Sequence, residues 1–194
     1  MNVFDFDKTI YSGDSTAAFF FWCLKKHPKV LIYVPKIAVA SLSYYAFHIG
    51  SKTDFKEKMY SFLRACDGEK DVAEFWKENI KNIKRFYIDM HRDDDVIISA
   101  SPEFLLKPLE KELKIKVIAS IVDINTGKYT GVNCYHAEKV RRFREIYPDG
   151  NIDSFYSDSY SDEPLAAIAQ SAYIVDGENI SEWDHTHHKK NLRV

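Results

Sequence analysis

Residues 2–9 read Asn-Val-Phe-Asp-Phe-Asp-Lys-Thr, so an apolar run passes directly into two carboxylates separated by one residue. The run 2–6 has the pattern of a short buried strand, and Gly13 with its polar neighbours then marks a turn. Because alternate residues of a strand point to the same side, Asp5 and Asp7 are expected to share a face. The sequence therefore predicts a buried strand that ends in a pair of acidic side chains.

A long helical segment follows this strand, from residue 14 to about residue 87. Asp14 or Ser15 can cap its first helix, and Pro28 ends that helix. The further helical patterns are an apolar stretch at 30–49, which Pro35 and Lys36 interrupt, and amphipathic helices at roughly 53–65 and 69–87.

The pattern changes after residue 87, where strands alternate with helices. Ser101-Pro102 predicts the start of a helix, with the proline in its favoured first position. Asn125-Thr126-Gly127 is a turn signal, after which 129–132 is expected to pair back as a hairpin. Asp93, Asp94 and Asp95 are expected to form a solvated turn. Strands are predicted at 96–98, 115–122, 154–157 and 172–175, with a helix at 137–147.

Alternating strands and helices predict an α/β protein with a parallel sheet and right-handed crossovers. We expect a Rossmann-like catalytic core made of residues 1–12 and 88–183. An all-helical cap, residues 13–87, would be inserted after the first strand. Residues 184–194 are polar and are expected to be disordered.

The composition excludes several classes of protein. The net charge of −2 and the lack of a basic excess argue against nucleic-acid binding. Cys23, Cys66 and Cys134 are far apart in sequence, which favours a reduced, cytoplasmic protein over a disulfide framework. Asp5 and Asp7 interrupt the N-terminus before the apolar core of a signal peptide could form.

Polar residues recur where the predicted strands end. Because the carboxyl ends of parallel strands meet at one edge of a sheet, they are expected to form one site. Crowded carboxylates repel one another, and oxygen ligands suit Mg²⁺, so the sequence predicts a magnesium site that could bind a phosphoryl group. A carboxylate can attack phosphorus when a metal and a lysine screen its charge. The residues are Asp5, Asp7, Ser99, Lys139, Asp158 and Asp162.

Four segments resemble the ordered motifs of the haloacid dehalogenase superfamily. Asp5-Phe-Asp-Lys-Thr9 resembles its DxDx[TV] motif, and Ser99-Ala-Ser-Pro-Glu-Phe104 resembles the second motif in the phosphoserine-phosphatase-like branch, subfamily IB. Lys139 fits the third motif, and Asp158-Ser-Tyr-Ser-Asp162 resembles the fourth. The resemblance covers nearly the whole predicted core and implies a phosphatase with a helical cap that excludes water.

The resemblance also implies a role for each matching residue. Asp5 would be the nucleophile and Asp7 the general acid and base. Mg²⁺ would be bound by the carboxylates of Asp5 and Asp158 and by the backbone carbonyl of Asp7. Ser99, Ala100 and Lys139 would bind the phosphoryl group. Thr9 would steady the loop after the nucleophile, and Asp162 would hold Lys139 or metal-bound water.

The sequence departs from phosphoserine phosphatases at several positions. Lys8 stands where glycine or serine is common, and the fourth motif lacks a GDGxND-like sequence. Asp14 stands where those enzymes carry a substrate-reading glutamate. The expected substrate is a small phosphorylated metabolite such as a phosphoserine-like compound. Asp14 and Ser161 are expected to contact it. A phosphotransferase and a catalytically inert phosphoryl-binding module remain alternatives.

The apolar, aromatic-rich part of the predicted cap, 19–49, leaves three readings open. It can pack inside the cap, contact a membrane surface peripherally or form a dimer interface; the oligomeric state stays open. Lys25, Lys26, Lys29 and Lys36 border the apolar runs, which suits an interfacial helix beside anionic lipid. The layout also resembles phosphatidylglycerophosphatase C and its relatives, which implies a lipid headgroup phosphatase as the alternative function and a possible association with the membrane.

Overall fold

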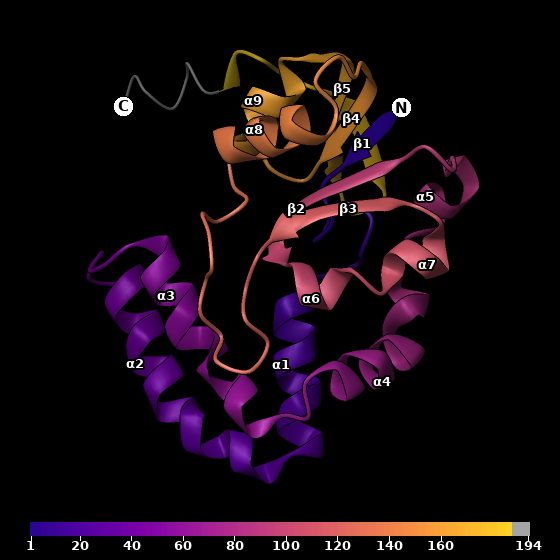
Figure 1. Cartoon of the computed structure of the whole chain (residues 1–194). Helices are drawn as coiled ribbons and strands as arrows, with labels where there is room; N and C mark the ends of the chain where they lie inside the picture. Colours follow the sequence, from indigo (N-terminus) through magenta and orange to yellow (C-terminus); the bar gives the residue numbers. More distant parts are fainter. Residues whose placement is uncertain (188–194) are drawn as a thin grey trace.

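One six-stranded sheet organises the molecule, described here from a computed structural model for residues 1–187 (Figure 1). The strand order is β3-β2-β1-β4-β5-β6, and all neighbouring strands are parallel except β5 and β6. The predicted α/β class and parallel sheet are therefore confirmed. The strands are β1 (Asn2–Phe4), β2 (Val96–Pro102), β3 (Lys116–Ser120), β4 (Ile152–Ser157), β5 (Ala169–Asp176) and β6 (Asn179–Glu182).

Both faces of the sheet are covered along β1, β2 and β3, which explains the short apolar runs in these three strands. Adjacent residues of β1 belong to different halves of the core: Val3 packs with Phe143 and Leu165, and Phe4 packs with Tyr87. The first half lies under α8 (Ala137–Ile146) and α9 (Glu163–Ala166). The other half includes side chains of α6 (Glu103–Leu106), α7 (Leu109–Leu113) and the inserted helices.

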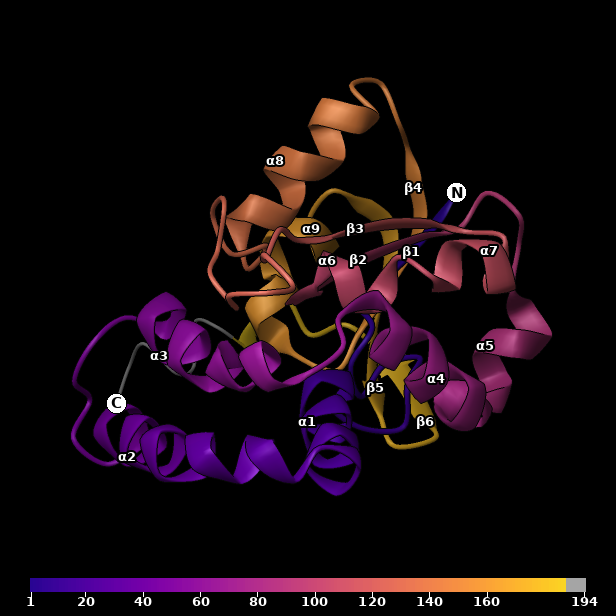
Figure 2. The same cartoon turned by 60° about the horizontal axis from the view of Figure 1, so that its bottom comes forward.

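Helices fill the connection between β1 and β2, as predicted. Asp14 caps α1 by accepting a hydrogen bond from the Ala17 amide at 2.8 Å, and Ser51 with Asp54 forms a capping box on α3. The elements are α1 (Ser15–Lys26), η1 (Pro28–Tyr33), α2 (Val34–Tyr45), α3 (Lys52–Met59), η2 (Tyr60–Ala65), α4 (Glu69–Asn79), η3 (Ile80–Asn82), α5 (Arg85–Met90) and, later in the chain, η4 (Tyr160–Asp162). Figure 2 draws α1, α2 and α3 together below the sheet.

Two charged residues stabilise the position of the helical segment, one by contacts within the segment and one by contacts to the core. Asp71 of α4 is buried, and its carboxylate accepts from His27 Nε2 at 2.7 Å and pairs with Lys26 Nζ at 3.0 Å, which ties α4 to the end of α1. Lys84 Nζ donates to the carbonyls of Lys8 and Gly177 at 2.6 Å each. The first contact joins the segment to the loop that follows β1, and the second joins it to the turn between β5 and β6.

Several local predictions need correction. The helix predicted at 69–87 is broken into α4, η3 and α5, and α5 crosses the proposed cap boundary at residues 87 and 88. Pro102 is the last residue of β2, where it pairs with Ser120 of β3 and has an extended ψ of 135°. It therefore precedes α6 and is not the first residue of that helix. Asp95 is 1% exposed and accepts from the Arg92 amide at 2.9 Å, so it is not solvated.

The predicted hairpin is reduced to one antiparallel bridge, between Val122 and Tyr129. The turn itself forms, since the Gly127 amide donates to the Asp123 carbonyl at 2.8 Å. The chain then leaves the sheet because it contacts the helical segment, where Glu57 accepts from the Tyr129 amide at 2.9 Å. In Figure 1 this loop descends from β3 towards α3 and returns to α8.

The predicted tail begins with contacts to the core. His185 Nδ1 lies 2.8 Å from Glu163 Oε1, and the His187 ring stacks on Tyr160 with centroids 4.0 Å apart. Residues 188–194, the rest of the tail that we expected to be disordered, lie outside the described residues.

Candidate active site

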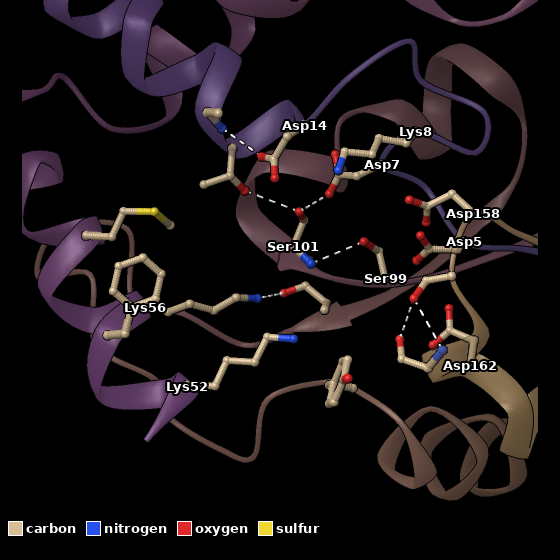
Figure 3. Close-up of a pocket in the computed structure, with 18 of the residues that line it drawn as sticks. Asp5, Asp7, Lys8, Asp14, Lys52, Lys56, Ser99, Ser101, Asp158 and Asp162 are labelled. Carbon is tan, nitrogen blue, oxygen red and sulfur yellow. Dashed lines mark hydrogen bonds between the residues drawn. The ribbon is translucent and has the colours of Figure 1, made fainter. Parts of the chain in front are cut away.

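A pocket opens at the carboxyl ends of β1, β2 and β4, where the strand order changes direction. This is the position at which open α/β sheets bind ligands. The pocket has a volume of about 330 Å³, and its core wall and α3 wall face each other in Figure 3. It brings together all the sequence-predicted site residues except Thr9, which is buried beneath it: Asp5, Asp7, Asp14, Ser99, Ala100, Lys139, Asp158, Ser161 and Asp162.

Lys139, on the first turn of α8, is the buried cation of this pocket. It is 2% exposed, and its Nζ donates to Asp5 Oδ1 and to Asp162 Oδ2, at 2.7 Å each. Ser157 Oγ donates to the same Asp162 oxygen at 2.8 Å. Burial works to lower the pKa of Lys139, but Asp162 and Asp5 outweigh it and raise that pKa. Lys139 therefore stays charged and holds one Asp5 oxygen, so the other is available to a ligand.

Asp5 itself is 8% exposed. Burial raises the pKa of Asp5 to about 7, against the opposing effect of Lys139 and with a further upward contribution from Asp162. The loss of hydration on burial outweighs the attraction of Lys139, and Asp162 adds to it, which explains why Lys139 alone does not restore the usual pKa of Asp5.

Asp7 is held by the start of α1 and by β2. Its Oδ1 accepts from the Ser15 amide at 2.6 Å, and its Oδ2 accepts from Ser101 Oγ. Burial and the nearby Asp14 raise the pKa of Asp7 to about 6, although the hydrogen bonds from Ser101 and Ser15 act in the other direction. The carboxylate is thus fixed in orientation beside Asp5.

The loop after β1 is shaped by an unusual backbone conformation. Lys8 has φ of +59°, a left-handed value that glycine adopts more easily, and its amide donates to the Gly13 carbonyl at 2.8 Å. This explains why glycine suits the position. Thr9 Oγ1 accepts from the Asp158 amide at 2.9 Å, so Thr9 joins the loop after β1 to the end of β4.

Ser99 and Ala100 lie on β2 at the floor of the pocket. Ser99 Oγ accepts a hydrogen bond from the Ser101 amide at 3.1 Å, which orients the hydroxyl. The Ala100 carbonyl accepts from Lys56 Nζ at 2.8 Å and from Ser120 Oγ at 3.1 Å. β2 therefore also anchors a lysine that comes from α3.

Sequence reasoning missed Lys52 and Lys56, which line the pocket from α3. They are four residues apart and therefore on one helix face, but nothing in the sequence indicates that this face meets the sheet edge. Burial lowers the pKa of Lys56 to about 8, with a further contribution from Lys52. Lys52 Nζ lies 3.6 Å from the centre of the Tyr135 ring. In Figure 3 both side chains extend towards the strand-end residues.

The donor set fits a magnesium ion. Asp5, Asp7 and Asp158 offer only oxygen ligands at one edge of the sheet, and burial raises the pKa of all three carboxyls. A raised pKa means that the protein alone stabilises the ionised carboxylates poorly. A hard divalent cation bound between them would stabilise this ionised form. Nothing softer than oxygen stands among these three, which disfavours zinc or copper.

Comparisons with known proteins agree with this geometry. The model of the family described as haloacid dehalogenase-like hydrolase matches residues 3–167. No curated protein gives a significant match. A protein of unknown function from Bordetella pertussis Tohama I is 20% identical with a TM-score of 0.68, over 89% of this chain and 87% of that one.

Two further solved structures share the fold. A phosphoserine phosphohydrolase-like protein from Francisella tularensis is 18% identical, with a TM-score of 0.53 over 89% of this chain and 86% of that one. A probable phosphoserine phosphatase from Vibrio cholerae is 12% identical, with a TM-score of 0.64 over 88% of this chain and 55% of that one. At these identities the structures establish the fold alone. The family match, which spans most of the chain, establishes more: this chain belongs to the haloacid dehalogenase-like hydrolases.

Proposed function

We propose that the protein is a Mg²⁺-dependent phosphomonoester hydrolase that forms an aspartyl-phosphate intermediate on Asp5. The observation that carries the proposal is the contact between Asp5 and the buried Lys139, at 2.7 Å, at the base of an open pocket. Lys139 screens part of the charge of the nucleophile and fixes its orientation. Asp158 would complete the magnesium site with Asp5 and Asp7.

In the first step the free oxygen of Asp5 bonds to phosphorus, and the bond from phosphorus to the leaving oxygen breaks. Asp7 gives its proton to that oxygen. In the second step Asp7 takes a proton from water, the water oxygen bonds to phosphorus, and the bond to Asp5 breaks to release phosphate. Ser99, with its hydroxyl at the pocket floor, and Lys139 contact the phosphoryl oxygens. Mg²⁺, when bound, supplies positive charge that offsets the charge of those oxygens.

The substrate is proposed to be a small phosphorylated metabolite with a second acidic group. Lys52 and Lys56 form no ion pair with a carboxylate among residues 1–187, although both line the pocket. Two adjacent lysines without such a partner favour an anionic ligand. Asp14 and Ser161, which also line the pocket, are the proposed contacts for its polar groups.

A lipid headgroup phosphatase of the phosphatidylglycerophosphatase C type is the second candidate. It is favoured by the apolar side chains on one wall of the pocket, Tyr45, Phe55 and Met59, of which Tyr45 is 67% exposed. A phosphoserine-like substrate needs no such wall. A panel of phosphoserine, sugar phosphates and phosphatidylglycerophosphate ranks the two candidates by kcat/KM.

The chemistry is tested with Asp5→Asn on an aryl phosphate. We expect activity to fall by about three orders of magnitude or more, because the amide is a poor nucleophile. Asp149→Asn, at an exposed position away from the pocket, is the matched control and should keep wild-type activity. Full activity of Asp5→Asn would refute the assignment, and wild-type inactivity across the panel would favour a phosphoryl-binding module. Transfer of phosphate to added alcohols in preference to water would identify a phosphotransferase.

A further inference from the structure

Helix α2 has apolar side chains on both of its faces. Towards the rest of the helical segment it places Ala40, which is buried, and Tyr44, whose ring stacks on Phe55 with centroids 5.0 Å apart. On the opposite face Val39 and Leu42 are 65% and 58% exposed. A helix that is apolar all round is normally buried, so its outer face lacks a partner.

The exposed apolar side chains continue beyond α2. Ile32 precedes α2 in η1, and Val39 and Leu42 are three residues apart on one face of α2. Together with Leu31 and Tyr45 they form what we call the outer cap face, and each of the five side chains is more than half exposed. Figures 1 and 2 both draw α2 at the outer edge of the molecule. Exposed apolar groups gathered in this way mark an interaction surface.

The charged side chains on the stretch of chain that carries this face are all lysines. The sequence from Ser15 to Thr53 contains five lysines and no aspartate or glutamate. Lys25, Lys29 and Lys36 are exposed, and within residues 1–187 no ion pair involves them. Lys26 is different, because it pairs with Asp71 and Glu74. The partner of the outer cap face must therefore offer negative charge beside apolar surface.

We propose that the outer cap face docks onto an anionic lipid bilayer. Interfacial helices bind in this way, with apolar side chains below the headgroups and lysines among them. A two-fold contact between copies of this chain is less favourable, since it would bring the lysines together with no carboxylate from 15–53 to offset them. Among the helices of residues 1–187, none has the length and apolar character needed to span a bilayer.

Tyr45 connects this surface to the pocket, since it belongs to the outer cap face and also lines the pocket. A ligand at the membrane surface would thus find the pocket mouth at the edge of the docked face. The docking goes beyond the proposed chemistry and does not require it, because Val39 and Leu42 do not line the pocket.

Co-sedimentation of the full chain with vesicles tests the proposal without any substrate. We expect binding to phosphatidylcholine vesicles that contain phosphatidylglycerol, weaker binding at high salt, and little binding to phosphatidylcholine alone. The variant Val39→Glu/Leu42→Glu should bind at least about tenfold more weakly, because each glutamate replaces a buried apolar contact and is repelled by the lipid. Val132→Glu is the matched control, since Val132 is 63% exposed on the core, and it should bind like wild type.

Three outcomes would overturn the docking. They are equal binding of wild type to both kinds of vesicle, equal binding of the double variant and wild type, and a wild-type dimer in sedimentation equilibrium that the double variant abolishes. Hydrolysis of a soluble aryl phosphate, measured on the same samples, reports the proposed function separately. If the wild type hydrolyses the aryl phosphate but does not bind vesicles, only the docking proposal is refuted. If it binds vesicles but is inactive, only the proposed phosphatase function is refuted.

Discussion

At the scale of single residues, the site depends on charges that the chain holds out of water. Lys139 is a lysine in an ordinary amphipathic helix when the sequence alone is considered, and by itself it would be expected on the surface. The fold buries it between Asp5 and Asp162. Its role therefore follows from the position of α8 against the end of β1. In the sequence, only its place in the ordered motifs identified Lys139 as a candidate site residue.

Lys52 gives a residue-scale prediction. Lys52→Gln should lower kcat/KM for a phosphomonoester with a second acidic group about tenfold more than for an aryl phosphate. The reason is that a charged hydrogen bond to the second group contributes roughly 1.5–3 kcal/mol. Lys58→Gln, an exposed position on the same helix, serves as the control. Steady-state kinetics on the two substrates measures the ratio, and equal losses would contradict a second anionic group.

At the scale of elements, the turn at Gly127 determines how the loop after β3 meets η2. Gly127 has φ of +72°, and a Cβ there would lie 2.5 Å from the Tyr60 carbonyl oxygen. We expect Gly127→Ala to destabilise the protein by about 2–4 kcal/mol, because both the backbone angle and the space oppose a side chain. Thermal unfolding should show a fall in Tm of roughly 4–12 °C.

Gly177 offers a matched control for this substitution. Its φ is +61°, but an added Cβ would meet nothing within 4 Å. Gly177→Ala should therefore cost only the backbone term, about 1 kcal/mol. If the two variants melt at the same temperature, the close approach of Gly127 to Tyr60 does not contribute to stability.

At the scale of the whole molecule, the magnesium site should couple to folding. Asp5, Asp7 and Asp158, from the ends of β1 and β4, line one pocket only in the folded chain, so Mg²⁺ should bind the native state alone and stabilise it. At about one hundred times the Kd the gain is roughly 2.7 kcal/mol, which corresponds to a rise in Tm of roughly 5–10 °C.

The melting experiment has its own control. Asp158→Asn should lose most of the magnesium-dependent rise because it removes one anionic ligand, whereas Asp149→Asn should keep it. Calorimetry with and without Mg²⁺ measures both. A wild-type Tm that does not respond to Mg²⁺ would contradict the proposed metal site and leave the assignment of the fold untouched.

The α/β class, the parallel sheet and the family could be predicted without the structure, because strand periodicity and the ordered motifs are local patterns. It also placed Asp5, Asp7 and Asp158 at strand ends, since a carboxylate after a buried strand needs no tertiary information to be recognised. The division into a core and a cap at residues 13–87 stays a prediction. The sequence did not find β6, whose four residues are all exposed and carry no apolar run.

Which faces of the helices and loops meet could not be predicted from local patterns. The loop after β3 has the local signals of a hairpin, but contacts to Glu57 and Tyr60 from a distant helix replace strand pairing. Lys56 enters the pocket because α3 faces the end of β2 across it. Helix α2 keeps an apolar face outward although a helix that is apolar all round is normally buried. Burial depends on neighbours that are remote in sequence, and for this reason the pattern along the chain could not assign it.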